Sequence, residues 1–490
     1  MILQTLFNSL ENNSEFNAFC IRDEFYTYGQ LNNYIKKAVH AILTQCPDEN
    51  VIAIEMSNDI ETYAALLAIL RLGKCLVTLN PRFPNARTAS IIEQASISFV
   101  FSKKQEINHK YIRRLSLLEI DPLQVFPSMK CSAKDEAYIL FTSGSTGQPK
   151  GVKISYENLN SFLISMEDLN VDYSECHRYL QMFDLTFDVS IAMILLPLLH
   201  GGCIYTVDAN EIKFLAAYQV MEKYLLDFIC IVPSMISYLE PYKDEINLPA
   251  VKYCIFTAEA SSEKTIELWK GCVPNAEIIN LYGPTEATIW CLGYFWKKDI
   301  KNEDYFGLIP IGKPLSKVSC IIQSKDGEIV NKPNTKGELC LGGDQITSGY
   351  LKNPEKNRSS FIIKNDVRYY KTGDLCFYNN DGNIMYCDRI DNQVQVQGFR
   401  VELNEIELRA KESLNYSKIV AVPIKNKLGN TEILLVTDYP YLDKESLMLT
   451  LKEKLPFYML PSRIESLNEI PINQNGKTDR NLLKSMFGFQ

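Results

Sequence analysis

The feature that most constrains this chain is a loop rich in glycine and hydroxyl groups between two apolar runs. It spans Phe141 to Val152, reads FTSGSTGQPKGV, and follows the apolar segment Tyr138-Ile139-Leu140. The glycines let backbone N–H groups approach an anion, the hydroxyls can donate to phosphate oxygens, and Lys150 supplies a positive charge. A Walker A loop is excluded, because Pro149 and Gly151 flank the lysine where that pattern requires Gly-Lys-Ser/Thr. The composition alone leaves two interpretations open, a flexible surface loop and a polyphosphate cradle.

The order of residues in this loop resembles the signature of the adenylate-forming superfamily, which includes acyl-CoA synthetases, luciferases and amino-acid adenylation domains. That signature reads (Y/F)TSG(S/T)TGxPKGV, and every position of it is present here. The resemblance implies a set of residues that bind the phosphates of ATP: Thr142, Ser143, Gly144, Ser145, Thr146, Gly147 and Lys150.

Composition bounds the class of protein. A chain of 490 residues with 46% apolar and 22% charged residues has room for two or more globular domains. The net charge of −8, without a basic stripe, argues against a nucleic-acid surface. The longest nonpolar run, Ile191 to Leu199, is about half a membrane span and is expected to be buried core. The N-terminus lacks the features of a secretory signal, so we expect a cytoplasmic protein without a membrane anchor.

Cysteine and histidine usage excludes several kinds of site. The 14 cysteines show no CxxC or Cys/His spacing, so neither a zinc site nor a disulfide framework is indicated, and we expect them to be small core residues. The four histidines lie away from any Ser or Cys motif, which disfavours a triad-type hydrolase.

Periodicity predicts an alternation of helices and strands. Tyr26 to Leu31 is expected to open the first helix, Glu61 to Leu72 to form a second that ends at Gly73, and Cys75 to Leu79 to form a buried strand. Ser155 can cap a helix that reaches about residue 169, and strands then alternate with helices to about residue 290. Such βαβ units predict parallel sheets, in which ligands gather beyond the carboxyl ends of the strands.

Asp188 precedes the apolar run in the segment Phe187-Asp188-Val189-Ser190. An aspartate before a buried helix is usually an N-cap, and that is the alternative interpretation. The segment is similar to the FDxS segment of amino-acid adenylation domains, where the resemblance implies that the carboxylate binds the α-ammonium of the substrate. A buried carboxylate and a buried ammonium each need the other, since either alone would be costly.

Tyr282-Gly283-Pro284-Thr285-Glu286 follows the strand-like run that contains Asn280. A Gly-Pro turn at a strand end, an aromatic ring and a hard carboxylate suit a nucleotide and Mg²⁺. The stretch resembles the superfamily motif (N/A)xYGPTE. The resemblance implies that Asn280 and Tyr282, with Gly283, address the nucleotide, that Thr285 contacts the α-phosphate and that Glu286 binds magnesium.

The segment Tyr370 to Leu375 resembles the YxTGDL motif, which implies that Asp374 binds the ribose hydroxyls; without that resemblance Gly373-Asp374 would be read only as a turn. Tyr386 lies where the family places an aromatic residue near the nucleotide. Arg389 and Asp391 match the segment GRxDxQVKxRGxRIE, as a nucleotide contact and as the hinge. That segment departs from the pattern at Asp388, Gln395 and Gln397, which bears on the thioester step rather than on the first half-reaction.

Lys477 follows Asn475-Gly476, a tight-turn signal that predicts a hairpin-like tip. A lysine at such a tip is ordinarily just solvated. Resemblance to the NGKxDR motif implies instead the catalytic lysine that bridges the substrate carboxylate and the α-phosphate. The helix expected from Glu402 to Leu414 and the short elements after it predict an α+β domain around this lysine.

The whole chain therefore resembles stand-alone amino-acid adenylation domains of nonribosomal peptide synthesis and the ligases that load D-alanine onto a carrier protein. The implied fold is α/β: a large N-terminal domain, residues 1–390, of two α/β sheets and a small β-barrel-like subdomain, and a small mobile α+β domain, residues 391–490. The implied reaction uses ATP and Mg²⁺ to form an aminoacyl-AMP, which is transferred to the phosphopantetheine thiol of a carrier protein. Because the chain ends at Gln490, soon after Lys477, we expect the carrier to be a separate chain.

The neighbouring motifs place the amino-acid pocket, whose lining is apolar apart from Asp188 and Lys477. A charged substrate side chain would lie there without a partner, so a small or medium apolar amino acid is expected. Proline is the first expectation, because Ala258 and Leu281 resemble the pocket of prolyl-adenylating enzymes; alanine, valine, glycine and cysteine remain open. An acyl- or aryl-CoA synthetase is the rival class, and a non-catalytic adenylate-binding protein is a second rival. The predicted lining is Asp188, Val189, Ala192, Ile231, Phe256, Ala258, Leu281, Ile289 and Trp290.

Overall fold

The computed structural model describes residues 2–102, 113–115, 117, 120–127, 131–144, 147–208, 211–298, 305–412, 418–439, 442–472 and 478–488. The chain divides into two compact units. The large unit comprises Met1–Asn80, Ile92–Leu140 and Gly151–Asp388, and the small unit comprises Pro81–Ile91, Phe141–Lys150 and Arg389–Gln490. The small unit thus takes in the predicted phosphate loop as far as Lys150. The predicted division after residue 390 and the hinge at Asp391 stay predictions.

The first sheet of the large unit has nine strands in the order β15-β14-β13-β12-β11-β9-β10-β1-β2. The strands from β13 to β1 pair in parallel, and the outer strands β15, β14 and β2 pair antiparallel. This confirms the parallel sheets that the βαβ pattern predicts. The bounds are β1 Asn17–Ile21, β2 Glu24–Thr27, β9 Arg178–Gln181, β10 Cys203–Thr206, β11 Phe228–Ile231, β12 Tyr253–Phe256, β13 Glu277–Tyr282, β14 Leu292–Trp296 and β15 Lys313–Pro314.

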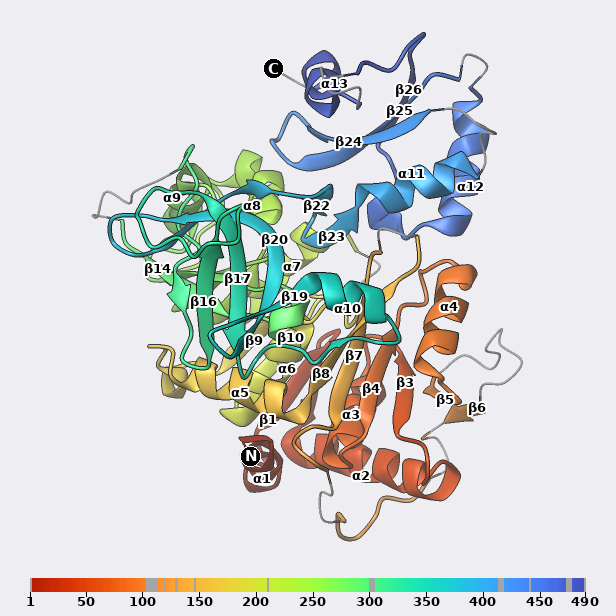
Figure 1. Cartoon of the computed structure of the whole chain (residues 1–490). Coiled ribbons are helices and arrows are strands. Elements are labelled where there is room, and N and C mark those ends of the chain that lie inside the picture. The colour runs from red at the N-terminus through yellow and green to blue at the C-terminus, as the bar shows by residue number, and fades with distance from the viewer. Residues whose placement is uncertain are drawn as a thin grey trace. The chain divides into compact units, whose positions relative to one another are not determined.

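A second sheet has seven strands in the order β18-β8-β7-β4-β3-β5-β6, and β3, β4 and β7 run side by side in Figure 1. Pairs β3–β4, β3–β5, β4–β7 and β5–β6 are parallel, and β18 joins β8 antiparallel. The bounds are β3 Val51–Glu55, β4 Cys75–Leu79, β5 Phe99–Phe101, β6 Arg113–Leu115, β7 Glu136–Thr142, β8 Lys150–Ser155 and β18 Gly349–Tyr350.

A third sheet, of five strands, is antiparallel in the order β16-β17-β20-β19, with β21 paired to β20. The register between β17 and β20 shifts between Glu338 and Cys340, opposite Thr372-Gly373-Asp374. Gly373-Asp374 is therefore not a chain-reversing turn, as the local sequence suggests, but a bulge inside a long strand. The bounds are β16 Val318–Gln323, β17 Gly337–Gly343, β19 Phe361–Lys364, β20 Val367–Tyr378 and β21 Ile384–Arg389.

Two helix ends that the sequence predicts in the large unit are present, the cap at Ser155 and the end of α3 at Gly73. Thr27 and Ser155 each form a capping box at the start of α2 and α5, and Gly73, after α3, has a φ of +71°. One expectation was wrong, because a helix, α1, precedes the segment at Tyr26 to Leu31. The bounds are α1 Ile2–Asn12, α2 Tyr28–Gln45, α3 Ile60–Arg71, α5 Tyr156–Glu167, η1 Tyr173–Glu175, α6 Val189–Leu199, α7 Lys213–Tyr224, α8 Pro233–Leu239, η2 Glu240–Tyr242, α9 Glu263–Cys272, η3 Thr285–Ala287 and α10 Pro354–Ser360. Helix α4, Asn85–Ala95, has residues in both units.

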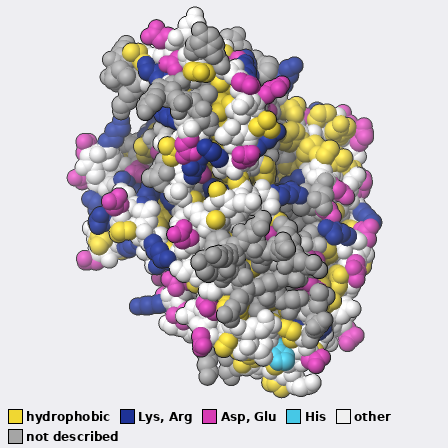
Figure 2. All heavy atoms as spheres, turned by 90° about the vertical axis from the view of Figure 1, so that its right-hand side faces the viewer, with side chains coloured by type: hydrophobic (Ala, Val, Ile, Leu, Met, Phe, Trp, Pro, Cys, Tyr) yellow, Lys and Arg dark blue, Asp and Glu magenta, His cyan; other side chains and the backbone are white. Residues whose placement is uncertain are grey.

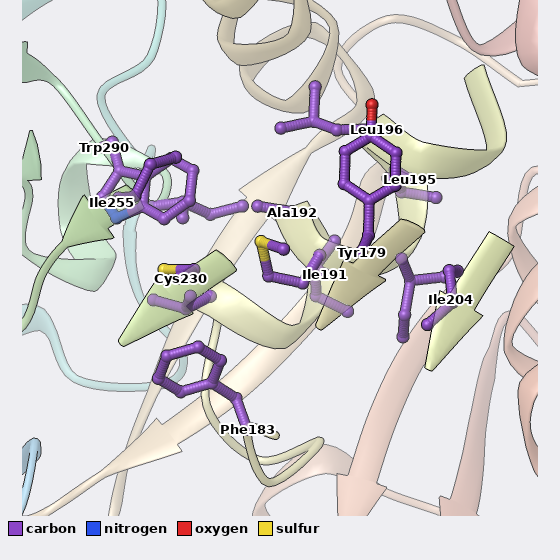
Figure 3. Close-up of a cluster of buried hydrophobic side chains, with 14 of the residues drawn as sticks. Tyr179, Phe183, Ile191, Ala192, Leu195, Leu196, Ile204, Cys230, Ile255 and Trp290 are labelled. Carbon is purple, nitrogen blue, oxygen red and sulfur yellow. The ribbon is translucent and has the colours of Figure 1, made fainter. Parts of the chain in front are cut away.

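Helix α6 is the centre of the core of the large unit. Every residue from Val189 to Leu198 is buried, as expected for a helix that is apolar on all sides. Figure 3 shows side chains of α6 among those of β9, β11 and β12, with Trp290 in the same cluster. The long nonpolar run is therefore core, as the sequence predicts. Among the described residues, no helix combines the length and apolar character needed to cross a bilayer.

The small unit is an α+β arrangement, which confirms the class expected for the C-terminal region. Strands β22 and β23 form a hairpin, and β24, β25 and β26 form a second sheet, with apolar clusters packed on it. Helix α11 begins one residue later than predicted and ends at Lys411. The bounds are β22 Gln393–Val396, β23 Phe399–Glu402, α11 Leu403–Lys411, β24 Ile419–Lys425, β25 Thr431–Thr437, α12 Lys444–Lys454, η4 Phe457–Met459, β26 Arg463–Ser466 and α13 Arg480–Phe487.

All 14 cysteines are free, and 11 of them are buried, so they behave as the small core residues that the sequence predicts. Within the described ranges, no cluster of three or more His, Cys, Asp or Glu side chains could hold a metal ion. The face drawn in Figure 2 carries acidic and basic side chains interspersed with each other.

Candidate active site

Asp188 lies at the N-terminal end of α6 but does not cap it. The side chain is 5% exposed, and its Oδ2 meets no hydrogen-bond donor among the described residues. Burial raises the pKa of this carboxyl to about 6, and a hydrogen bond from the Thr285 hydroxyl lowers it in part. The capping role, which was the alternative interpretation, is therefore wrong. An unpaired buried oxygen of this kind suits a cationic group that a ligand brings with it.

The predicted pocket residues on strands lie where three adjacent parallel strands end. Ile231 of β11 is opposite Phe256 of β12, and Phe256 is opposite Asn280 of β13. Leu281 follows on β13, and Ala258 comes two residues after the end of β12. The tertiary structure thus brings together four predicted pocket residues that the sequence spreads over fifty positions. Ile231, Phe256 and Leu281 are at most 1% exposed, and Ala258 is partly exposed.

The remaining pocket residues come from α6 and from the segment before β14. Val189 and Ala192 belong to the first turns of α6, and Ala192 shares the buried cluster of Figure 3 with Trp290. Trp290 is fully buried, and its Nε1 donates to Thr257 Oγ1 at 2.8 Å. Ile289 is also buried. Most of the lining is therefore buried, and Ala258 is the one partly exposed residue of the predicted set.

Strained backbone marks two places in this lining. Ala258, Thr288 and Ile289 have φ values of 68°, 56° and 69°, a region that residues with side chains rarely adopt, least of all β-branched ones. Such conformations tend to gather at ligand-binding sites. None of the three residue types signals this conformation in the sequence.

Tyr282 and Asp374 are joined directly, since the Tyr282 hydroxyl donates to Asp374 Oδ2. Burial, followed by the charge of Asp374, keeps the pKa of Tyr282 well above its ordinary value, so the phenol remains a donor. The bulge in β20 places Asp374 beside the tyrosine, and its backbone N–H is bonded to Thr372 Oγ1 at 3.0 Å. At Gly283, a Cβ would lie 2.0 Å from the carbonyl oxygen of Ile289, so the turn requires glycine.

Asn280 and Tyr386 have protein surroundings of their own. The Asn280 amide donates to the Pro310 carbonyl at 2.8 Å and accepts from Ser261 Oγ at 3.1 Å. Tyr386 lies in β21, partly buried against the core. The side-chain amide of Asn280 is thus held at a fixed orientation at the strand end, and its contact with the nucleotide stays a prediction.

Glu286 sits in the short helix η3, which also contains Thr285. Its carboxylate is 1% exposed, and Oε1 accepts a hydrogen bond from the Tyr350 hydroxyl at 2.6 Å. Its backbone carbonyl accepts from the N–H of Thr347 at 2.9 Å. A single fixed carboxylate fits Mg²⁺, which is commonly held by one or two carboxylates together with water and substrate phosphates.

The phosphate loop belongs to the small unit. Ser143, Gly144, Gly147 and Lys150 are described, as is Thr142, whereas Ser145 and Thr146 lie outside the described residues. A Cβ at Gly144 would lie 1.9 Å from the Gln148 carbonyl oxygen, so the loop can close only with glycine there. The Lys150 ammonium is 2.9 Å from the Glu402 carboxylate.

Arg389 and Asp391 are paired with each other in a two-pronged ion pair of 2.9 and 2.6 Å. Burial by itself would raise the pKa of Asp391, but the hydrogen bonds and charge of Arg389 outweigh it, so the pKa lies below its ordinary value. Lys477 lies outside the described residues, between Ile472 and Thr478, whose backbones pair antiparallel.

Residues 6–351 match the family described as AMP-binding enzyme, which is more than half of the chain. The chain belongs to the AMP-binding enzyme family. This confirms the superfamily resemblance carried by the phosphate loop, and the α/β fold agrees with it.

Curated relatives of this AMP-binding enzyme are large synthetases. It is 28% identical over 507 residues to tyrocidine synthase 3 of Brevibacillus parabrevis, covering 100% of this chain and 8% of that protein. It is 30% identical over 508 residues to malpinin synthetase of Mortierella alpina, covering 96% of this chain and 6% of that protein. With gramicidin S synthase 1 of Brevibacillus brevis the identity is 26%, covering 95% of this chain and 42% of the relative. The chain therefore spans less than half the length of these relatives.

Two solved structures share the fold of this AMP-binding enzyme. The Vibrio cholerae adenylation domain AlmE, in complex with glycyl-adenosine-5'-phosphate, superposes with a TM-score of 0.87 at 22% identity, covering 99% and 97% of the two chains. PA1221, described as an NRPS protein containing adenylation and PCP domains, gives 0.86 at 21% identity, covering 98% and 83%.

Several residues that the site uses escaped the sequence reasoning. Thr257 and Tyr350 orient Trp290 and Glu286, and Glu402 contacts the phosphate loop. A hydroxyl or a charged residue far along the chain carries no local signal of a partner, so only the folded chain identifies these contacts.

Proposed function

We propose that this chain activates a small apolar amino acid with MgATP, forming an aminoacyl-AMP and pyrophosphate. The aminoacyl group is then transferred to the phosphopantetheine thiol of a carrier protein on a separate chain, and AMP leaves. The observation that carries the proposal is Asp188, a buried carboxylate with one oxygen free of hydrogen bonds among the described residues. An α-ammonium group would pair with that oxygen. Ligases that act on acids without an amine have no use for such a carboxylate.

In the first step, a carboxylate oxygen of the amino acid attacks the α-phosphorus of ATP, and the bond from that phosphorus to the β-bridging oxygen breaks. The chemistry needs positioning and charge stabilisation rather than a protein nucleophile. Lys477 is proposed to bridge the attacking carboxylate and the α-phosphate. Thr285 is proposed to donate to the α-phosphate, and for this its hydroxyl, which has a single proton, would turn away from Asp188. Bound magnesium would supply charge neutralisation on the phosphates, with Glu286 as its protein ligand.

A separate set of residues would hold the nucleoside. Asp374, fixed by the Tyr282 hydroxyl, is proposed to accept hydrogen bonds from the ribose. Asn280, held by Ser261 and Pro310, would face the adenine, with Tyr386 and Arg389 as further nucleotide contacts. A carboxylate anchored by a neighbouring phenol can bind two adjacent hydroxyls well, because it accepts their hydrogen bonds without changing its orientation.

The burial of the pocket lining bears on the size of the amino acid that can bind. Ala192, Ile231, Phe256 and Trp290 are 0% exposed, so the far end of the lining is packed with protein side chains. Glycine and alanine would require the least repacking of these side chains. Proline, the first expectation from sequence, and valine or cysteine would require the Trp290 side chain to move. AlmE, the structural neighbour solved with glycyl-adenosine-5'-phosphate, belongs to the small end of this range.

The test is amino-acid-dependent exchange of labelled pyrophosphate into ATP, run with all twenty amino acids and D-alanine. We expect exchange with glycine or a small apolar amino acid, and none with charged ones. Exchange that requires acids without an amine would refute the proposal in favour of the rival acyl- or aryl-CoA synthetase class.

Lys477→Ala is the companion variant, with Lys484→Ala of α13 as the control for loss of a lysine in the same region. We expect Lys477→Ala to abolish exchange while ATP binding persists, and the control to keep full activity. Unchanged turnover of Lys477→Ala would contradict the catalytic role of this lysine.

A further inference from the structure

Two carboxylates of the small unit contact the loop that the sequence predicts to bind phosphates. Glu405 Oε2 accepts the backbone N–H of Gly144 at 3.1 Å, and its other oxygen, Oε1, lies 2.8 Å from Nη1 of Arg87. Glu402 Oε1 lies 2.9 Å from the Lys150 ammonium. The Gly144 N–H, Lys150 and Arg87 thus already bind anions, and these anions are carboxylates of the chain itself.

These contacts are buried. The side chains of Arg87 and Glu405 are 4% and 2% exposed, and those of Lys150 and Glu402 are 7% and 6% exposed. Gln393 further holds Glu402, since its Nε2 donates to Glu402 Oε1 at 2.6 Å. The contacts therefore differ from surface ion pairs, whose partners exchange freely with water.

Arg87 has more donors than its partner uses. Its Nε and Nη2 are buried and have no hydrogen-bond partner among the described residues, and its guanidinium lies 5.6 Å from the centre of the Phe83 ring. A guanidinium with unused buried donors is unusual, because each such donor costs free energy. A group with more acceptor oxygens than a carboxylate, such as a polyphosphate, would satisfy them.

We propose that Glu402 and Glu405 compete with the β- and γ-phosphates of ATP, and with pyrophosphate, for one anion site formed by Gly144, Lys150 and Arg87. Arg87 is thereby a further phosphate-binding residue. The proposal rests on the proposed function for the identity of the anion. The carboxylates hold the site in the arrangement described above, and a polyphosphate must displace them.

The competition has a consequence for the reaction. ATP can occupy the loop only in molecules whose carboxylates have left it, so the apparent affinity for polyphosphate is reduced by the fraction of open molecules. After adenylate formation, return of the carboxylates would replace the pyrophosphate and favour its departure. Glu402 and Glu405 touch no reacting atom and act by positioning.

The experiment measures binding of inorganic pyrophosphate, with Mg²⁺ present, to the full chain by isothermal titration calorimetry. Glu402→Gln/Glu405→Gln keeps the shape of both side chains and removes their charges. We expect it to bind pyrophosphate about tenfold or more tighter than the wild type, because the competing anions are gone. Glu412→Gln is the matched control: it removes the same kind of charge from the end of α11, where Glu412 pairs with Arg409 and Lys454. The control should leave the affinity unchanged.

Arg87 is tested in the Glu405→Gln background, so that its replacement by methionine does not leave the buried Glu405 carboxylate without a partner. Arg87→Met/Glu405→Gln removes both members of the pair, and Arg87→Lys/Glu405→Gln restores a charge without the planar fork. Compared with Glu405→Gln alone, the first should bind pyrophosphate roughly tenfold or more weakly, and the second should lie between them. Melting temperatures establish that each variant is folded.

Two results would overturn the proposal. Equal affinity of Glu402→Gln/Glu405→Gln and Glu412→Gln would show that the carboxylates do not compete, and equal affinity of Arg87→Met/Glu405→Gln and Glu405→Gln would show that Arg87 is not a ligand. Both measurements are made without an amino acid. A failure of the proposed function, seen as the absence of amino-acid-dependent exchange, is therefore distinct from a failure of this inference.

Discussion

Replacement of Asp188 by asparagine should make the unliganded protein more stable and at the same time inactive. The carboxyl group is 5% exposed at the start of α6, and its pKa is raised from 3.8 to about 6 by burial. Asparagine has nearly the same shape and no charge. The variant therefore removes the cost of a buried anion together with the proposed partner of the substrate ammonium.

The magnitude follows from the pKa. Because the folded-state pKa is higher than the unfolded one, the group favours folding below pH 3.8, and this contribution is lost as the pH rises through 6. The loss amounts to about 3 kcal/mol at pH 7.5 and about 1 kcal/mol at pH 4.5. Asp188→Asn should therefore unfold at a higher temperature than the wild type at pH 7.5, by a margin that shrinks at pH 4.5.

Activity should move the other way. Removing one partner of a buried ion pair costs about 3 to 5 kcal/mol, which corresponds to a loss of roughly a hundredfold to several thousandfold in kcat/KM for the amino acid. Thermal unfolding at the two pH values and pyrophosphate exchange measure the two effects on the same samples.

Asp184→Asn is the matched control. It removes a carboxylate four residues earlier, but one that already accepts hydrogen bonds from Thr186 at 2.9 and 2.6 Å. The Asp184→Asn protein should be no more stable than the wild type at pH 7.5. An Asp188→Asn protein that is no more stable than the wild type at pH 7.5, or that retains amino-acid-dependent exchange, would refute the reasoning.

Three further predictions concern pH, Glu286 and the loop. The wild-type kcat/KM for the amino acid should be at half its maximum near pH 6, because a protonated Asp188 cannot pair with an ammonium, and should approach a tenfold fall per pH unit at lower pH. Exchange at low amino-acid concentration between pH 5 and 8 measures this, and a flat profile would contradict it. Tyr350→Phe removes the 2.6 Å hydrogen bond to buried Glu286 and should cost about 1 to 3 kcal/mol of stability, with lower exchange; an unchanged melting temperature would argue against it. Gly144→Ala places a Cβ 1.9 Å from the Gln148 carbonyl and should weaken ATP binding about tenfold in equilibrium dialysis, and an unchanged affinity would contradict the requirement for glycine at this position.

The sequence predicted much of the local structure because the signals were local. The cap at Ser155 fixes the start of α5, the nonpolar run after Asp188 is the buried helix α6, and Cys75 to Leu79 is a strand of the seven-stranded sheet. Without its motif, Gly373-Asp374 would predict a turn, whereas the structure has a bulge there. A bulge depends on the register against a neighbouring strand, here β17, and the local sequence contains no information about that register.

The phosphate loop and Asp188 show which features of the candidate site the sequence determines and which ones only the tertiary structure determines. The residue order of the loop predicted the family, and the structure gives one physical reason for that order, since only glycine permits the close approach at position 144. The sequence also singled out Asp188. Only the tertiary structure decided that Asp188 is buried without a cap bond, and that Glu402 and Glu405 reach Lys150 and Gly144 from more than 250 positions away. The physical reason is that burial and ion pairing are properties of neighbours in space, and the chain fixes those neighbours only when it is folded.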